Sequence, residues 1–174
     1  VDESRIGLGG ASAGGALALA AAREMPADGA HSTLLPAYLV LAYPVTHREW
    51  TPDPHVERLM AGIPQILRFP LEGVRSFTDA YLAGHPSPDL AFADGADLAG
   101  LPPVLVVLAE YDDLRTPAEG FVEQARACGV TVERRLARGM LHGHLNRTPV
   151  LGGVDETLDD IARVMVEGAV RGEP

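Results

Sequence analysis

Residues 5–15 read RIGLGGASAGG, a short apolar run that passes into a cluster of small residues around a serine. Residues Ile6–Gly9 predict a strand, and the Ala- and Leu-rich stretch 16–25 predicts a helix. Between them, Gly10-Ala11-Ser12-Ala13-Gly14 fits the pattern G-x-S-x-G. Directly after a strand and before a helix, this pattern is typical of a nucleophile elbow, a sharp turn that exposes its serine hydroxyl.

The residue types of this pentapeptide suit an acyl-transfer nucleophile. Gly10 and Gly14 are expected to prevent side-chain clashes across the turn, two positions to either side of Ser12. The N-terminus of the following helix favours negative charge, and the N–H group of Ala13 can donate to a tetrahedral oxyanion. Ser12 is therefore a candidate nucleophile, and Ala13 a candidate oxyanion donor.

A dinucleotide-binding turn or a plain tight turn is the alternative interpretation of the same stretch. Residues 7–9 begin like the pattern G-x-G-x-x-G, but Ser12 takes the place of its third glycine. The acidic residue expected about 20 residues further on does not close the next strand. No Gly-Lys-Ser/Thr follows, so the stretch is not a phosphate-binding P-loop.

Hydrophobic patterning along the rest of the chain predicts a sheet covered by helices. The expected strands are residues 38–42, 104–109 and 130–136, and the expected helices are 72–82, 116–128 and 155–168. The apolar face of helix 72–82 is expected to include Phe77 and Tyr81. Strands that alternate with helices predict an α/β fold, with a mostly parallel sheet and helices on both faces.

A serine nucleophile needs a base, and the base needs an acid that orients it. Asp112 and Asp113 follow the predicted strand 104–109, and His142 follows the predicted strand 130–136. Both positions lie at carboxyl ends of strands, where an open α/β sheet places its ligands. Singly, a loop acid and a surface histidine are ordinary features, but their order and location after Ser12 favour a catalytic triad.

Composition and charge limit the classes of partner. Lys and Arg number 14 against 24 Asp and Glu, and the net charge of −10 argues against nucleic acid and anionic membrane surfaces. No apolar run reaches the ~18 residues of a membrane span. The single cysteine, Cys128, excludes an intrachain disulfide and fits a reducing, cytoplasmic compartment. His142 and His144 lack a third ligand at metal-binding spacing, so no metal site is expected.

Four blocks of the sequence resemble the hormone-sensitive-lipase-like branch of the α/β-hydrolase carboxylesterases. The blocks are GGASAGG at 9–15, LPP at 101–103, YDDLR at 111–115 and GMLHG at 139–143, and the likeness extends over nearly the whole chain. The resemblance implies the α/β-hydrolase fold, with Ser12 as nucleophile, His142 as base and Asp112 as the orienting acid. Asp113 stands where the family usually has proline, so the resemblance favours Asp112. Ser12 Oγ is then expected within hydrogen-bond reach of His142.

The implied activity is that of a serine carboxylesterase or lipase-like hydrolase. It would cleave small to medium acyl esters through an acyl-serine intermediate, without a metal or an organic cofactor. Trp50, Phe69, Tyr81 and Phe92 either line an acyl or alcohol pocket or pack the excursion 45–100, which the resemblance places over the active-site face. A catalytically impaired fragment or an interaction module on the same scaffold is the alternative. A peptidase or dienelactone hydrolase is less favoured, because the GMLHG block resembles the esterase branch.

Three departures from the family pattern concern the site. Ala11 replaces an aspartate before the serine, and His144 replaces the phenylalanine of H-G-F. The family's H-G-G-G oxyanion loop, which precedes the elbow, has no counterpart in this sequence.

The chain is therefore expected to be one α/β-hydrolase domain over residues 1–174, truncated at its N-terminus and corresponding to the C-terminal half of the full fold. The apolar elbow strand Ile6–Gly9 is expected to need a neighbour on each side, and the sequence encodes one, residues 38–42. Either a missing N-terminal segment or a second subunit is expected to cover the other edge.

Overall fold

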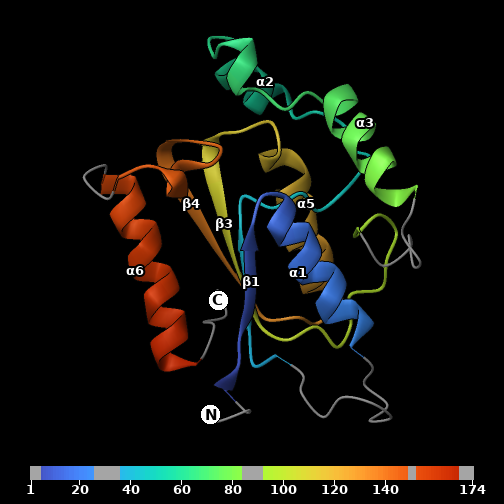
Figure 1. Cartoon of the computed structure of the whole chain (residues 1–174), viewed down its shortest axis with the longest axis vertical. Helices are drawn as coiled ribbons and strands as arrows, with labels where there is room; N and C mark the ends of the chain where they lie inside the picture. The colour runs from blue at the N-terminus through green and yellow to red at the C-terminus, as the bar shows by residue number, and fades with distance from the viewer. Residues whose placement is uncertain (1–4, 26–35, 84–91, 149–151, 169–174) are drawn as a thin grey trace.

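The described strands run parallel in one sheet, in the spatial order β1-β2-β3-β4 (Figure 1). The computed structural model describes residues 5–25, 36–83, 92–148 and 152–168. Its strands are β1 (Leu8–Ala11), β2 (Leu39–Ala42), β3 (Val104–Tyr111) and β4 (Val132–Leu141). Its helices are α1 (Ala13–Glu24), α2 (Pro54–Met60), α3 (Leu71–Leu82), α5 (Arg115–Ala127) and α6 (Gly152–Glu167), with 3-10 turns η2 (Gln65–Leu67) and η3 (His144–Asn146). The predicted α/β class is confirmed.

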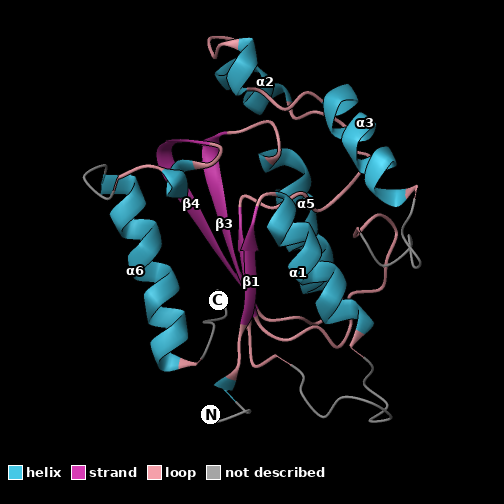
Figure 2. Ribbon diagram, in the orientation of Figure 1, coloured by secondary structure: helices cyan, strands magenta, loops and turns pink. Residues whose placement is uncertain are grey.

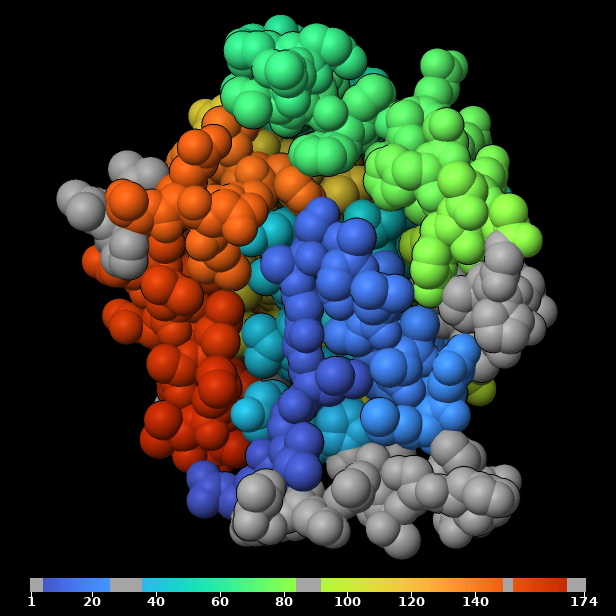
Figure 3. Space-filling model, in the orientation of Figure 1, coloured from blue at the N-terminus to red at the C-terminus, as the bar shows by residue number. Residues whose placement is uncertain are grey.

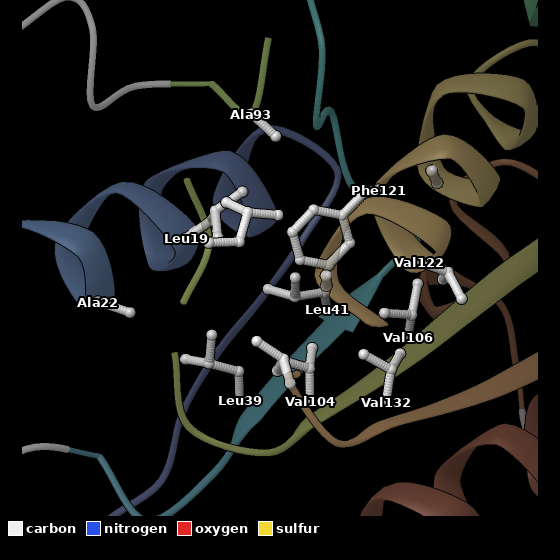
Figure 4. Packing of buried hydrophobic residues seen from close by; sticks show 14 of the residues in the cluster. Leu19, Ala22, Leu39, Leu41, Ala93, Val104, Val106, Phe121, Val122 and Val132 are labelled. Carbon is white, nitrogen blue, oxygen red and sulfur yellow. The ribbon is translucent and has the colours of Figure 1, made fainter. Parts of the chain in front are cut away.

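Helices cover both faces of this sheet (Figure 2), α1 and α5 on one side and α6 on the other. Leu39 and Leu41 of β2 pack with Phe121 in the cluster beneath α1 and α5 (Figure 4). Val40, between them in sequence, belongs to the cluster that contains Val164 of α6. Because successive strand residues face opposite sides, a strand covered on both faces must be apolar throughout. The continuous apolar runs of β2 and β3 have this cause.

The elements around the elbow differ from their predicted bounds. β1 begins at Leu8, two residues after the predicted start at Ile6, because its ladder with β2 opens with Leu8 opposite Leu39. Helix α1 begins at Ala13, three residues before the predicted start. Ser12 is consequently the single residue between strand and helix.

The segment between β2 and β3 leaves the sheet and carries α2 and α3. Both helices lie beyond the carboxyl ends of the strands, at the top of Figure 1. They therefore stand on the side of the sheet where the predicted site residues emerge. No helix in the described ranges is long and apolar enough to cross a bilayer.

Strand β1 has a neighbour on one side only among the described strands. Leu8 and Ser12 donate backbone hydrogen bonds to Tyr38 (3.0 Å) and Ala42 (2.9 Å). Since alternate amides of a strand face opposite edges, those of Gly9 and Ala11 point away from β2. A groove of about 330 Å³ runs along this edge. Figure 3 shows it as a hollow between β1 and α6. Its lining includes residues Gly7–Ala11 together with Leu145, Ile161 and Met165.

Candidate active site

Ser12 occupies a strained backbone conformation at the head of α1. Its φ of 56° and ψ of −121° lie in a region that non-glycine residues seldom adopt. Four backbone hydrogen bonds hold it there: its N–H donates to Ala42 at 2.9 Å, and its carbonyl accepts from Gly15 at 3.0 Å, Val45 at 3.2 Å and Ala16 at 3.4 Å. The strain is therefore held by β2 and by the first turn of the helix.

Of the two elbow glycines, Gly10 has the role predicted for it and Gly14 does not. A Cβ atom at Gly10 would lie 2.1 Å from the carbonyl oxygen of Gly14, so this position requires glycine. A Cβ at Gly14 would have no described atom within 4 Å, and the expectation of a clash there is wrong. Gly15, which the pattern does not include, would place its Cβ 2.7 Å from Cβ of Pro44. Helix α1 therefore leaves room for a side chain at Gly14 but lies in close contact with Pro44, just after β2, at Gly15.

The three predicted triad residues meet at the carboxyl edge of the sheet. Nε2 of His142 lies 2.8 Å from Oγ of Ser12, and Nδ1 of His142 lies 2.7 Å from Oδ2 of Asp112. β4 is longer than the predicted strand 130–136, and His142 follows its last residue directly. The expected hydrogen-bond reach between Ser12 and His142, and the expected pairing of His142 with Asp112, are both present.

The second aspartate has another partner. Asp113 accepts hydrogen bonds from the Arg68 guanidinium at 2.7 and 3.3 Å and from the Phe69 amide at 2.8 Å. It thereby fixes the segment before α3 to the loop after β3. The ring of Phe69, whose amide Asp113 holds, lies 4.3 Å from the ring of His142.

Burial and hydrogen bonding set the charge state of Asp112. Its side chain is 1% exposed, and burial raises the pKa of the carboxyl, while the hydrogen bond and charge of His142 act in the opposite direction. Oδ1 accepts the amide N–H of Leu114 at 3.0 Å, and Oδ2 is left for the imidazole. With Asp112 ionised, Nδ1 of His142 carries the proton, and Nε2 is free to accept the Ser12 hydroxyl proton.

The amide of Ala13 is available for an oxyanion. It is the first amide of α1, where no preceding turn supplies a carbonyl acceptor. Ala13 is also exposed, on the solvent side of the elbow. Together with the positive end of the helix dipole, this N–H favours negative charge beside Ser12.

An apolar pocket of about 160 Å³ adjoins the elbow between α1 and α3. It is lined by Ala13, Ala16, Leu17, Val45, Phe77, Thr78, Tyr81 and Phe92. On the apolar face predicted for this helix, Val74 is buried, whereas Phe77 and Tyr81 are 46% and 39% exposed and line the pocket. Of the four aromatic residues considered for a pocket, Tyr81 and Phe92 line this one. Phe69 packs on His142, and Trp50 lines a separate, more polar cleft with Arg68 and Asp113.

Tyr43 is a site residue that the sequence reasoning missed. It follows β2 with a positive φ of 37°, and its ring lies 4.9 Å from the ring of His142. An aromatic residue before Pro44 at a strand end is a weak signal for such a role. His144, considered as half of a metal pair and as the replacement for a phenylalanine, is buried against α6. In the described part of the chain, no cluster of three or more His, Cys, Asp or Glu side chains is arranged for a metal ion.

The triad geometry is accompanied by matches to known proteins. A family described as having the alpha/beta hydrolase fold matches residues 1–146. The chain belongs to this α/β-hydrolase family. It is 32% identical over 155 residues to carboxylesterase NlhH of Mycobacterium tuberculosis, an alignment that covers 83% of this chain and 45% of the relative.

Two solved α/β-hydrolase structures extend the likeness to three dimensions. EstE1, a thermostable carboxylesterase cloned from a metagenomic library, superposes with a TM-score of 0.78 at 32% identity, covering 98% of this chain and 57% of its own. An esterase from the bacterial hormone-sensitive lipase family superposes with a TM-score of 0.78 at 30% identity, covering 96% and 54%. These matches confirm the resemblance to the hormone-sensitive-lipase-like branch. The chain spans about half the length of the relatives that it matches.

Proposed function

We propose that this α/β-hydrolase is a serine carboxylesterase in which Ser12 is the nucleophile, His142 the base and Asp112 the orienting acid. The observation that carries the proposal is the pair of hydrogen bonds from His142, 2.8 Å to Ser12 and 2.7 Å to Asp112. The orientation of both ring nitrogens suits transfer of the hydroxyl proton to an imidazole that a buried carboxylate steadies. The named carboxylesterases among the matched proteins support the same reaction class.

The proposed reaction proceeds in two balanced halves. Ser12 Oγ attacks the ester carbonyl carbon while Nε2 of His142 takes the hydroxyl proton, and the amide of Ala13 donates to the oxyanion. Collapse breaks the bond to the alkoxy group, which leaves as the alcohol with the proton from Nε2. Water then adds to the acyl-Ser12 carbonyl by the same steps, and the acid is released. Asp112 stabilises the imidazolium in both halves.

The apolar pocket supports an ester with a hydrocarbon part. Its lining begins at Ala13, the neighbour of the nucleophile, and presents almost no polar surface. A volume of about 160 Å³ suits a small to medium acyl or alkoxy chain rather than a long one. Burial of each methylene there would favour binding by about 0.8 kcal/mol.

A fluorophosphonate probe, which phosphonylates an activated serine, tests this proposal. We expect Ser12 to be labelled, and the label to be absent in Ser12→Ala and strongly reduced in His142→Ala. A folded chain that takes up no label would contradict the proposal and favour the alternative, an interaction module on the hydrolase scaffold. Turnover of a short p-nitrophenyl ester then separates a working esterase from an impaired one that stalls after acylation.

The open edge of β1 supports a second part of the proposal. We propose that the chain forms one domain whose β1 edge is covered in the functioning protein, either by a strand from a preceding segment or by a second copy of the chain. The outward amides of Gly9 and Ala11 and the adjoining apolar groove favour a strand there. A covering segment would also be the natural source of a second oxyanion donor beside Ala13.

A cytoplasmic location is proposed from the single cysteine alone.

A further inference from the structure

A second histidine is buried beside the triad, and the proposed reaction does not use it. His144 lies two residues after His142, on the 3-10 turn η3, and is 3% exposed. Its Nε2 atom lies 3.1 Å from Oγ1 of Thr157 on α6. The Thr157 hydroxyl donates its own proton to the carbonyl of Gly153 at 2.8 Å. The hydroxyl oxygen must then accept from His144, which places the imidazole proton on Nε2.

The other ring nitrogen of His144 has no partner. Nδ1 is buried and makes no hydrogen bond to any described residue. In the neutral ring it carries a lone pair, and a proton arriving there would put a full positive charge in a buried place, which burial disfavours and which the backbone of Leu141 and the charge of Asp112 only partly offset. The buried ring at this position is therefore a group that can titrate.

Tyr43 links this ring to the triad base. Its ring contacts His144 edge-on at 5.1 Å and His142 edge-on at 4.9 Å. Tyr43 is 2% exposed and its amide donates to Val107 at 2.6 Å, so it is fixed between the two imidazoles. A change in the position of His144 is therefore transmitted to His142 through a rigid neighbour and through the short turn that joins the two histidines.

The charges around His144 act in both directions. Burial lowers the pKa of the His144 imidazole, and a positive His142 lowers it further, whereas a backbone contact with Leu141 and the charge of Asp112 act the other way. The titratable groups that face it are thus Asp112, His142 and Tyr43. During the proposed reaction His142 becomes an imidazolium, which a second positive ring nearby would disfavour.

From these contacts we infer that His144 is a positioning residue: its neutral ring ties the turn after His142 to Thr157 of α6 and supports Tyr43, and its protonation in acid disables the site. The inference rests on the proposed function of Ser12, His142 and Asp112. It predicts that activity lost in acid depends on one more proton in the wild type than in a variant whose residue 144 cannot titrate.

The test compares fluorophosphonate labelling of Ser12 from about pH 4 to 8, the range in which histidines titrate, in three proteins. They are the wild type, His144→Phe, which keeps a ring but cannot titrate, and Thr157→Val, which removes the hydrogen bond but keeps the histidine. At neutral pH both variants should label roughly threefold to tenfold more slowly, the loss expected for one net hydrogen bond. In acid, the wild type and Thr157→Val should lose labelling with a two-proton dependence, and His144→Phe with a one-proton dependence. Far-UV circular dichroism at each pH confines the comparison to folded protein.

Several results would overturn the inference. A one-proton loss in the wild type would remove His144 from the acid response, and a two-proton loss that persists in His144→Phe would assign the second proton to Asp112. Variants that label at the wild-type rate at neutral pH would remove the positioning role.

If the wild type does not label at any pH, the proposed function fails. The imidazole ¹H–¹³C NMR signals then decide this inference separately: that of His144 must shift with acid in the folded chain, and that of His142 must move with it.

Discussion

Ser12 and His142, whose side chains meet at 2.8 Å, belong to opposite edges of the sheet. Ser12 follows β1 at one end of the strand order, and His142 follows β4 at the other. β4 ends level with its partner β3, since Leu141 pairs with Tyr111 after a register shift between Ala109 and Tyr111, and His142 follows directly at the carboxyl ends of the strands. The site therefore depends on the order of the whole sheet rather than on any local motif.

Asp112→Asn separates catalysis from stability. Labelling should fall by roughly 10⁴, because the amide holds His142 in the wrong tautomer. Since burial raises the pKa of Asp112 in the folded chain, the folded state binds this proton more readily than the unfolded state does. The ionised carboxyl therefore reduces stability at neutral pH, and the penalty fades as the pH falls through the folded pKa. Calorimetry should show a higher melting temperature for the variant at pH 7 and a smaller difference in acid; a lower one at pH 7 would contradict the sign.

Asp113→Asn should have the opposite profile. It removes the charge that accepts hydrogen bonds from Arg68 and Phe69. The Asp113 side chain is 12% exposed, so water replaces these hydrogen bonds only in part. The free energy of unfolding should fall by roughly 1.5–3 kcal/mol, the range for hydrogen bonds that involve a charged group. Labelling should fall less than tenfold, since His142 keeps its contacts with Ser12 and Asp112. Urea titration and labelling measure both, and a loss as large as that of Asp112→Asn would move the catalytic acid to Asp113.

Two glycines of the elbow form a matched pair. Gly10→Ala places a methyl group 2.1 Å from a backbone oxygen, which only a shift of the turn can relieve, whereas Gly14→Ala meets no described atom within 4 Å. We expect Gly10→Ala to lower the melting temperature and abolish labelling. Gly14→Ala should keep the fold and allow Ser12 to be labelled, and it should raise the stability of α1, because the helix propensity of alanine exceeds that of glycine by about 1 kcal/mol. Equal damage from both would show that the turn differs from the one described.

The apolar pocket predicts a preference in chain length. For p-nitrophenyl esters, kcat/KM should rise about fourfold for each methylene that the pocket buries and then level off. Leu17→Trp, which fills the pocket from α1, should lower kcat/KM for the longer esters and spare the acetate. Leu158→Trp, at a similarly exposed position on α6 outside the pocket, is the control. An unchanged chain-length profile in Leu17→Trp would place the hydrocarbon part of the ester elsewhere.

Hydrogen exchange tests the cover proposed for β1. In a monomer with an open edge, the amides of Gly9 and Ala11 should exchange quickly, while that of Leu8, bonded to Tyr38, is protected. If sedimentation shows a dimer and the amides of Gly9 and Ala11 are protected only in that dimer, a second copy of the chain covers the edge. Fast exchange in a monomer that turns over slowly indicates a covering segment from elsewhere. A monomer with fast exchange at this edge and ordinary esterase turnover would refute the need for a cover.

Local sequence determined the elements and the chemistry that they carry. The G-x-S-x-G pentapeptide after an apolar run fixes a serine between a strand and a helix, because small residues permit the tight turn. The apolar runs of β2 and β3 predict strands covered on both faces, since each residue in turn must be buried. The hydrophobic pattern also predicts that Ser12, Asp112 and His142 each come directly after a strand, in that chain order.

Only the tertiary structure decided which neighbours these residues have. Asp112 and Asp113 are identical in type and adjacent in sequence; the family resemblance favoured Asp112, but it is the turn after β3 that directs Asp112 to His142 and Asp113 to Arg68. The clash at Gly15 rather than Gly14, and the position of Tyr43 between two imidazoles, likewise depend on where β2 ends against α1 and α6. These contacts join residues far apart in the chain, so periodicity and motif spacing, which describe near neighbours, carry no information about them.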